Sequence, residues 1–209
     1  MIKAVVFDMD GVLVDTEWFF NRRRVAYLEQ NGFHFDEIPD LTGSDERSIW
    51  EFFVPGDEVR REELRVGYLA YQKDHPVPYA ELVNESARPV LRDLRARGIR
   101  TAIASSSPRE HIEDLIEHAA LHGLLDYIIS GHDCTAFKPD PEIYLRTMEA
   151  LGVTPTETVI IEDSPIGIRA GKASGGLVLA LRPREGVQLD QGEADAVIES
   201  LDEVIGCIG

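Results

Sequence analysis

Two aspartates near the start of the chain have the spacing of a reaction centre. Asp8 and Asp10 directly follow a short apolar run at residues 4–7, and Gly11 comes next. The β-branched and aromatic run predicts a buried strand, and the glycine lets the chain turn where that strand ends. One carboxylate at such a place can attack an electrophile while the other transfers a proton, with a hard cation between them. The alternative is a turn in which the aspartates cap a helix.

Further polar side chains follow the other predicted strands. These strands are apolar throughout and are separated by helical segments, which predicts a parallel sheet covered on both faces. Ligands bind such sheets outside the carboxyl ends of the strands. The strands are expected at residues 4–7, 99–104, 127–129, 158–161, 177–181 and 196–198. The residues that follow them include Asp8, Asp10, Ser105, Ser106, Ser107, Lys138, Glu162, Asp163 and Ser164.

The chemistry of this set is that of phosphoryl transfer. Four carboxylates at one edge repel one another, and a divalent cation relieves the repulsion; ligands that are all oxygen favour Mg²⁺ over Zn²⁺. A carboxylate nucleophile can accept a phosphoryl group as an aspartyl-phosphate. Such a reaction needs positioning and charge neutralisation, which Lys138 and the Ser105 hydroxyl can provide at the phosphoryl oxygens.

Four segments in order carry a resemblance to a known family. Residues 8–11, 104–106, 137–140 and 161–164 resemble the four motifs of the haloacid dehalogenase (HAD) superfamily. The continuation at residues 163–171 is similar to its phosphatase and β-phosphoglucomutase branch. Motif order and spacing match across nearly the whole chain, so the resemblance implies an enzyme.

The resemblance implies a role for each carboxylate. Asp8 is expected to be the nucleophile and a Mg²⁺ ligand. Asp10 is expected to be the general acid and base, with its backbone carbonyl on the metal. Glu162 and Asp163 are expected to complete the metal site, directly or through water.

The resemblance also assigns the phosphoryl contacts. Ser105 and Lys138 are expected to bind the transferring phosphoryl group, with Ser106 nearby as a substrate contact.

A helical segment interrupts the α/β pattern. Residues 16–82 are predicted to be all-helical, contain both tryptophans, and have helix-breaking prolines at positions 76 and 78. The predicted fold is therefore α/β: a Rossmann-like parallel sheet with helices on both faces plus an inserted all-helical cap. The α/β core domain is expected at residues 1–15 and 83–209, and the cap domain at residues 16–82.

The cap is expected to select the substrate. Thr16, Gly43 and Arg47 are candidate substrate-binding residues there. The adjacent Arg22, Arg23 and Arg24 are interpreted as a solvated face, from which one arginine could meet a substrate phosphate.

A capping pattern is predicted in the core. Residues 107–110 read Ser-Pro-Arg-Glu, which predicts a capping box with proline at the first helical position.

The favoured function is a Mg²⁺-dependent phosphatase acting on a small phosphorylated metabolite, such as a sugar or polyol phosphate. Asp10 argues against dehalogenation, because haloacid dehalogenases of the family usually lack it. A β-phosphoglucomutase-type mutase is the alternative. It is weakened by Phe20 and Thr42, which stand where family mutases carry a histidine and a basic residue. A second alternative is a non-catalytic binding protein on the same fold, but such proteins usually lose the nucleophile or the metal carboxylates.

Composition limits the partners. The net charge is −17, with 38 acidic and 21 basic residues, so nucleic acid and anionic membrane are poor partners. Two cysteines without paired spacing, no signal-peptide pattern and no membrane-length apolar stretch favour a cytoplasmic protein. The sequence does not indicate an oligomeric state.

Overall fold

The chain forms two compact units in the computed structural model, which describes residues 1–37, 41 and 46–208. The first, here called the α/β unit, comprises residues 1–15 and 79–209; the second, the helical unit, comprises residues 16–78. The sequence predicted that the chain returns from the helical unit to the α/β unit four residues later, after residue 82. Residues Tyr79–Leu82 form helix α4, which packs against α6 (Arg109–His118) of the α/β unit.

The α/β unit is built on six parallel strands in the order β3-β2-β1-β4-β5-β6. The predicted parallel sheet is confirmed, and each strand lies within one residue of its expected bounds because each is a short apolar run. The strands are β1 (Ala4–Phe7), β2 (Arg100–Ser105), β3 (Tyr127–Ser130), β4 (Thr158–Glu162), β5 (Leu177–Leu181) and β6 (Ala196–Ile198).

The strand order creates one switch point. The chain adds β2 and β3 on one side of β1, then returns to add β4, β5 and β6 on the other side. Phe7 pairs with Ile103 on one neighbour and with Ile161 on the other. The residues after β1 therefore emerge between the ends of β2 and β4, the place where ligands bind in sheets of this kind.

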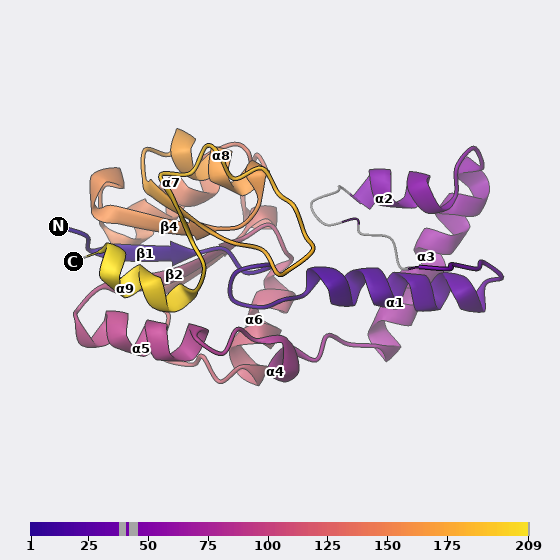
Figure 1. Ribbon diagram of the computed structural model, residues 1–209, viewed down its shortest axis with the longest axis horizontal. Helices are drawn as coiled ribbons and strands as arrows, with labels where there is room; N and C mark the ends of the chain where they lie inside the picture. Colours follow the sequence, from indigo (N-terminus) through magenta and orange to yellow (C-terminus); the bar gives the residue numbers. More distant parts are fainter. Residues whose placement is uncertain (38–40, 42–45, 209) are drawn as a thin grey trace. The chain divides into compact units, whose positions relative to one another are not determined.

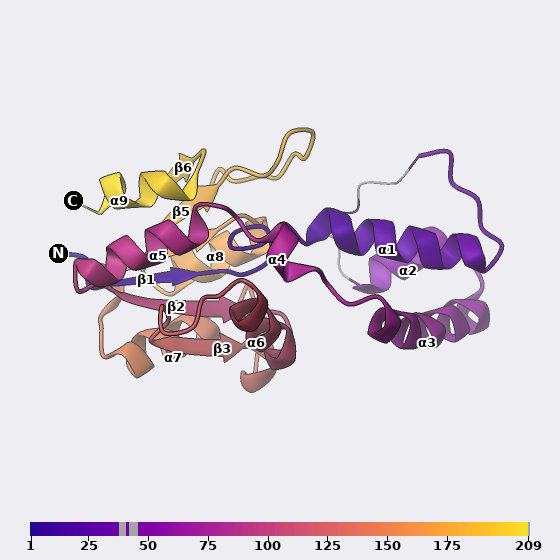
Figure 2. The same cartoon turned by 90° about the horizontal axis from the view of Figure 1, so that it is seen from below.

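Helices cover both faces of the sheet (Figures 1 and 2). One face packs against α7 (Glu142–Leu151) and α8 (Pro165–Ala173) through a buried cluster that includes Val6, Ile160 and Met148. The opposite face is covered by α5 (Ala87–Ala96), α6 and α9 (Val204–Cys207). The short 3₁₀ helices η1 (Gly131–Asp133), η2 (Pro155–Glu157) and η3 (Leu201–Glu203) lie in the connections.

Local signals explain where most of these helices begin and end. The Ser164 hydroxyl accepts the N–H of Gly167 at the start of α8, and Gly152 has the left-handed φ of 63° that ends α7. The capping box predicted at Ser107 is wrong. Helix α6 begins at Arg109 with Pro108 as its N-cap and no side-chain cap, because the Ser107 hydroxyl is hydrogen-bonded elsewhere.

The helical unit contains α1 (Glu17–Gln30), α2 (Glu46–Phe53) and α3 (Glu58–Asp74) around its own core. Trp50 and Tyr68 are buried there with ring centroids 5.6 Å apart. The Asp57 side chain accepts the N–H of Arg60 at the start of α3.

The solvated arginine face expected in α1 is wrong for two of its three members. Arg22 is exposed, but Arg23 and Arg24 are only 8% and 5% exposed. Arg23 donates to the Tyr68 hydroxyl at 3.2 Å and to the His75 carbonyl at 2.8 Å, and its guanidinium lies over aromatic rings. These contacts satisfy a buried cation, so it is part of the core of the helical unit.

This difference predicts unequal effects of neighbouring substitutions. Arg23→Ala removes two buried hydrogen bonds and should lower the free energy of unfolding by about 2 kcal/mol. Arg22→Ala is the matched control and should cost less than about 0.5 kcal/mol. Urea denaturation followed by tryptophan fluorescence measures this, because both tryptophans lie in the helical unit. Equal effects of the two substitutions would contradict the placement of Arg23.

Candidate active site

Three buried carboxylates meet at the switch point of the sheet. Asp8 leaves the end of β1, where its N–H donates to the Ile161 carbonyl at 2.9 Å. Glu162 ends β4, and Asp163 follows it. Their exposed fractions are 7% for Asp8, 0% for Glu162 and 7% for Asp163. Within the described ranges, these three residues each offer one oxygen, and the three oxygens lie within 4.8 Å of one another.

Lys138 occupies the centre of this cluster. Its ammonium group donates to Asp8 Oδ1 at 2.5 Å, to Glu162 Oε1 at 2.7 Å and to the Ala104 carbonyl at 3.0 Å. Its side chain is only 5% exposed. Burial opposes the charged form, but Asp8 and Glu162 hold the pKa of Lys138 well above its ordinary value. The lysine is therefore a fixed positive charge, with all three ammonium protons directed at acceptors.

One lysine does not neutralise the cluster. Burial raises the pKa of Asp8 to about 8 against the opposing attraction of Lys138, and the nearby charges of Glu162 and Asp10 raise it further. A nucleophilic carboxylate must be ionised, and further positive charge at this site would favour that form of Asp8. Buried oxygen ligands that converge within one ion's reach suit a divalent cation, and the residues present fit such an ion.

Glu162, which binds Lys138, is itself held by three further hydrogen bonds. Its Oε1 accepts the Tyr144 hydroxyl at 2.5 Å, while Oε2 accepts the Asp163 N–H at 3.2 Å and the Ser164 hydroxyl at 3.3 Å. Tyr144 is fully buried in α7. The sequence did not indicate Tyr144 as a site residue, because its position reads as the apolar face of a helix. Its hydroxyl fixes the carboxylate that holds Lys138.

Two glycines make room for the acidic side chains. Gly11 has φ of +80°, and a Cβ there would lie 2.1 Å from Asp163 Oδ2. A Cβ at Gly167, inside α8, would lie 1.9 Å from Glu162 Oε1. Both glycines are needed because the backbone approaches a carboxylate too closely for any side chain. Gln191 supports the same loop by donating to the Asp163 carbonyl at 2.8 Å.

The remaining predicted core residues lie at the ends of β1 and β2. Asp10 is half-buried, and its Oδ2 accepts the Ser107 hydroxyl at 2.7 Å. Ser105 is 1% exposed, and its hydroxyl oxygen accepts the Ser107 N–H at 3.0 Å. Ser106 is exposed. The α/β unit thus brings together every catalytic and metal residue expected from the sequence, in one place.

The predicted cap residues fall in the helical unit or outside the described residues. Gly43 and Thr42 are outside. Thr16 is fully buried, and its carbonyl accepts the N–H of Phe20 at the start of α1. Arg47 is bound to Glu51 at 2.9 Å, and its side chain is 87% exposed.

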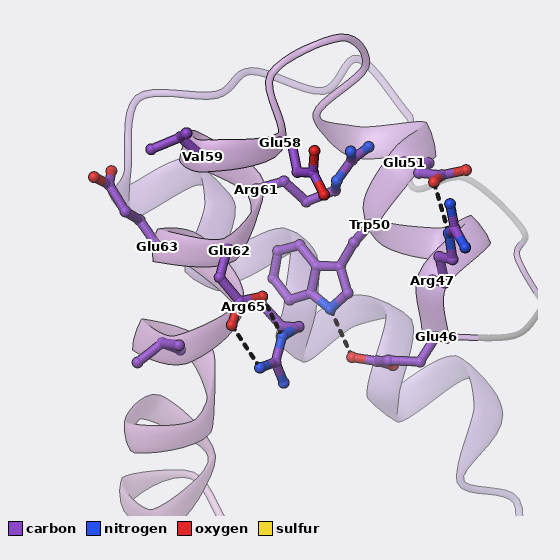
Figure 3. Close-up of a pocket in the computed structure, with 11 residues that line it drawn as sticks. Glu46, Arg47, Trp50, Glu51, Glu58, Val59, Arg61, Glu62, Glu63 and Arg65 are labelled. Carbon is purple, nitrogen blue, oxygen red and sulfur yellow. Dashed lines mark hydrogen bonds and ion pairs between the residues drawn. The ribbon is translucent and has the colours of Figure 1, made fainter.

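Arg47 lines an open groove of about 1220 Å³ beside α2 and α3 (Figure 3). Trp50 lies at its base and donates to Glu46 at 2.6 Å, and Arg65 is paired with Glu62. Five glutamates and three arginines line it, so its charge does not favour an anionic ligand.

Comparison with known proteins identifies the family. The sequence model of the haloacid dehalogenase-like hydrolases matches residues 2–175. The chain belongs to this family of enzymes, as the four motifs predicted. Members of the family use a divalent metal, and the acidic cluster of the α/β unit is the corresponding feature here.

Individual relatives extend over most of the chain. The Thermotoga maritima phosphorylated carbohydrates phosphatase is 32% identical over 178 residues, covering 83% of this chain and 82% of the relative. The validoxylamine A 7'-phosphate phosphatase of Streptomyces hygroscopicus is 28% identical over 209 residues, covering 98% of this chain and 96% of the relative. The structure of a β-phosphoglucomutase from Clostridium difficile has a TM-score of 0.71 at 23% identity, covering 98% of this chain and 93% of that one. That last likeness shows the fold alone.

The close approach of Gly167 to Glu162 yields a prediction. Gly167→Ala should lower the free energy of unfolding by about 1–3 kcal/mol through the forced shift of Glu162, despite alanine's better helix propensity. It should also lower activity, because Glu162 holds Lys138. Gly206→Ala in α9 is the control, since a Cβ there meets nothing within 4 Å. The control should be neutral or stabilising in thermal denaturation. A Gly167→Ala variant as stable as the control would contradict the close approach of Gly167 to Glu162.

Proposed function

We propose that this enzyme is a Mg²⁺-dependent phosphatase that hydrolyses small phosphorylated carbohydrates through an aspartyl-phosphate on Asp8. The observation that carries the proposal is the fixed lysine between Asp8 and Glu162, with Asp10 and Ser105 beside them. A buried carboxylate held against a cation is placed to attack phosphorus. The second carboxylate, two residues on, supplies the proton.

The first half-reaction would transfer the phosphoryl group to the enzyme. A carboxylate oxygen of Asp8 attacks phosphorus, the bond from phosphorus to the ester oxygen breaks, and protonated Asp10 gives its proton to the departing alcohol. Lys138 and Ser105 bind the phosphoryl oxygens as charge shifts among them. Lys138 must redirect at least one ammonium proton from its present acceptors, because all three are in use.

The second half-reaction would return the enzyme to its starting state. Asp10, now ionised, takes a proton from water as the water oxygen attacks phosphorus. The bond from Asp8 to phosphorus breaks, inorganic phosphate leaves, and Asp10 is protonated again. Asp10 acts as an acid in the first half-reaction and as a base in the second, so its position relative to Asp8 matters in both.

Asp8, Glu162 and Asp163, with the Asp10 carbonyl, would hold the metal ion. Oxygen ligands favour Mg²⁺. When bound, the ion supplies charge neutralisation that keeps Asp8 ionised and draws electron density from the phosphoryl oxygens.

The substrate class comes from relatives and charge. One similar protein is named a phosphorylated carbohydrates phosphatase, and another is named a validoxylamine A 7'-phosphate phosphatase. A net charge of −17 disfavours nucleic acid as a partner. None of the described helices has the length and apolar character needed to span a bilayer. Cys134 and Cys207 are free thiols, consistent with a cytoplasmic enzyme.

The proposal predicts phosphate release from a panel of sugar and polyol phosphates in the presence of Mg²⁺. Asp8→Asn should reduce turnover by roughly 10³-fold or more, because the amide cannot accept the phosphoryl group. A phosphate assay with β-glucose-1-phosphate in the panel measures this. Exposed Asp36→Asn is a control that should leave the rate unchanged.

Two results would overturn this proposal. Undiminished turnover by the Asp8→Asn variant would show that Asp8 is not the nucleophile. Conversion of β-glucose-1-phosphate to the 6-phosphate without free phosphate would identify the mutase alternative.

The raised pKa of Asp8 predicts how pH and Mg²⁺ compete. Without the ion, protonated Asp8 is favoured in the folded state, so its contribution to stability is full below the ordinary aspartate pKa and is lost as pH rises through about 8. Mg²⁺ needs the ionised form and should raise the melting temperature more at about pH 9 than at about pH 6. Thermal denaturation of wild type and Asp8→Asn measures the effect. A Mg²⁺ shift that is independent of pH would count against this account.

A further inference from the structure

The Ser107 hydroxyl has a use that its sequence context does not suggest. Serine followed by Pro-Arg-Glu ordinarily caps a helix, yet α6 has no side-chain cap. The hydroxyl instead donates to Asp10 Oδ2 at 2.7 Å, across 97 residues of sequence. A bond of this length is charge-assisted, and stronger than a neutral one, in the step of the proposed reaction in which Asp10 is ionised. The helix therefore begins without its serine cap, and Asp10 gains a fixed partner.

The backbone of Ser107 is itself held on both sides. Its N–H donates to the Ser105 hydroxyl at 3.0 Å, and its carbonyl accepts the Ser130 hydroxyl at 2.6 Å. Ser130 is fully buried at the end of β3 and also accepts the His132 N–H at 3.1 Å. The backbone of Ser107 is thus bonded to the ends of two neighbouring strands, which fixes the position from which its hydroxyl donates.

We propose that Ser107 is a positioning residue for Asp10, and that it orients this carboxylate for proton transfer to the leaving group and from water. The inference rests on the proposed function, because it assumes that Asp10 transfers the proton. By donating to Oδ2, Ser107 leaves the transferred proton on Oδ1. It also limits rotation of a short side chain that is followed by Gly11, whose φ is +80°. Orientation of this kind raises the rate of the chemical step without adding a substrate contact.

Ser130 acts on Asp10 only indirectly, through Ser107. Because it binds the Ser107 carbonyl and not Asp10, its loss should disturb the same carboxylate more weakly. The Ser105 hydroxyl oxygen is occupied by the Ser107 N–H, and its own proton remains a donor for a phosphoryl oxygen. The Ser107 segment therefore links the phosphoryl-binding serine to the proton-transferring aspartate.

The test is a double-mutant cycle on the best substrate of the phosphate-release panel. Ser107→Ala in the wild-type background should lower kcat by about tenfold, with KM nearly unchanged, through loss of one charged hydrogen bond. In an Asp10→Ala background, the same substitution should change kcat by less than about twofold, because its target is gone. Ser107→Thr keeps the hydroxyl and should recover most of the rate, and Ser130→Ala should show a smaller loss.

A matched control removes another serine–aspartate hydrogen bond, one that involves none of the proposed site residues. The Ser86 hydroxyl donates to Asp202 Oδ2 at 2.6 Å on the surface of the same unit, and Ser86→Ala should leave kcat and KM unchanged. Melting temperatures of all variants separate folding defects from catalytic ones, and Ser130→Ala serves if Ser107→Ala does not fold.

A second readout uses two aryl esters. Phenyl phosphate needs protonation of its leaving group, whereas 2,4-dinitrophenyl phosphate does not. Ser107→Ala should therefore lower kcat/KM for phenyl phosphate by about tenfold and for the dinitrophenyl ester by about twofold or less.

Several outcomes would overturn the assignment. Equal losses on both esters, or equal losses in the wild-type and Asp10→Ala backgrounds, would show that Ser107 acts by contacting substrate or by general structure. An unchanged kcat in Ser107→Ala would show that the bond has no catalytic effect. Failure of wild-type enzyme to release phosphate from any panel member is a different result, and it would overturn the proposed function.

Discussion

The site depends on one buried ammonium group placed between two carboxylates. Lys138 bonds Asp8 at the end of β1 and Glu162 at the end of β4, where neither charge is exposed to screening by water. Removing one member of such a pair leaves an uncompensated buried charge, at a cost of about 3–5 kcal/mol. The arrangement is tolerable because Tyr144, the Ala104 carbonyl and the backbone N–H of Asp163 complete the hydrogen bonds. Burial still holds the pKa of Asp8 above its ordinary value, and a divalent cation bound at these carboxylates would lower it.

The sheet makes this concentration of charge possible. Because β1 lies between β2 and β4, the segments that follow these strands leave the sheet at one edge. The segments after β1 and β4 carry carboxylates, the end of β2 carries Ser105, and Lys138 comes from the segment after β3. Gly11 and Gly167 remove the side chains that would collide with Asp163 and Glu162. The helical unit has a separate aromatic core, and the three buried carboxylates and Lys138 all belong to the α/β unit.

The sequence predicted the strands well, because buried parallel strands are short apolar runs. It failed where a side chain's partner lies far away in sequence. The local pattern at Ser107 was compatible with a helix cap, and only the tertiary fold shows that Asp10 takes its hydroxyl. Arg23 reads as a surface cation until Tyr68 and the His75 carbonyl are brought beside it. The periodicity of α7 places Tyr144 on an apolar helix face. Only the folded structure shows that its hydroxyl donates to Glu162.

The central claim is that Asp8 carries the phosphoryl group during turnover. Rapid acid quench of the enzyme mixed with Mg²⁺ and its best substrate, followed by peptide mass mapping, tests it directly. We expect one phosphoryl group per chain, located on Asp8, that forms and decays at the rate of phosphate release. Phosphate release with no phosphoryl group on Asp8, or with the group on another residue, would contradict the account.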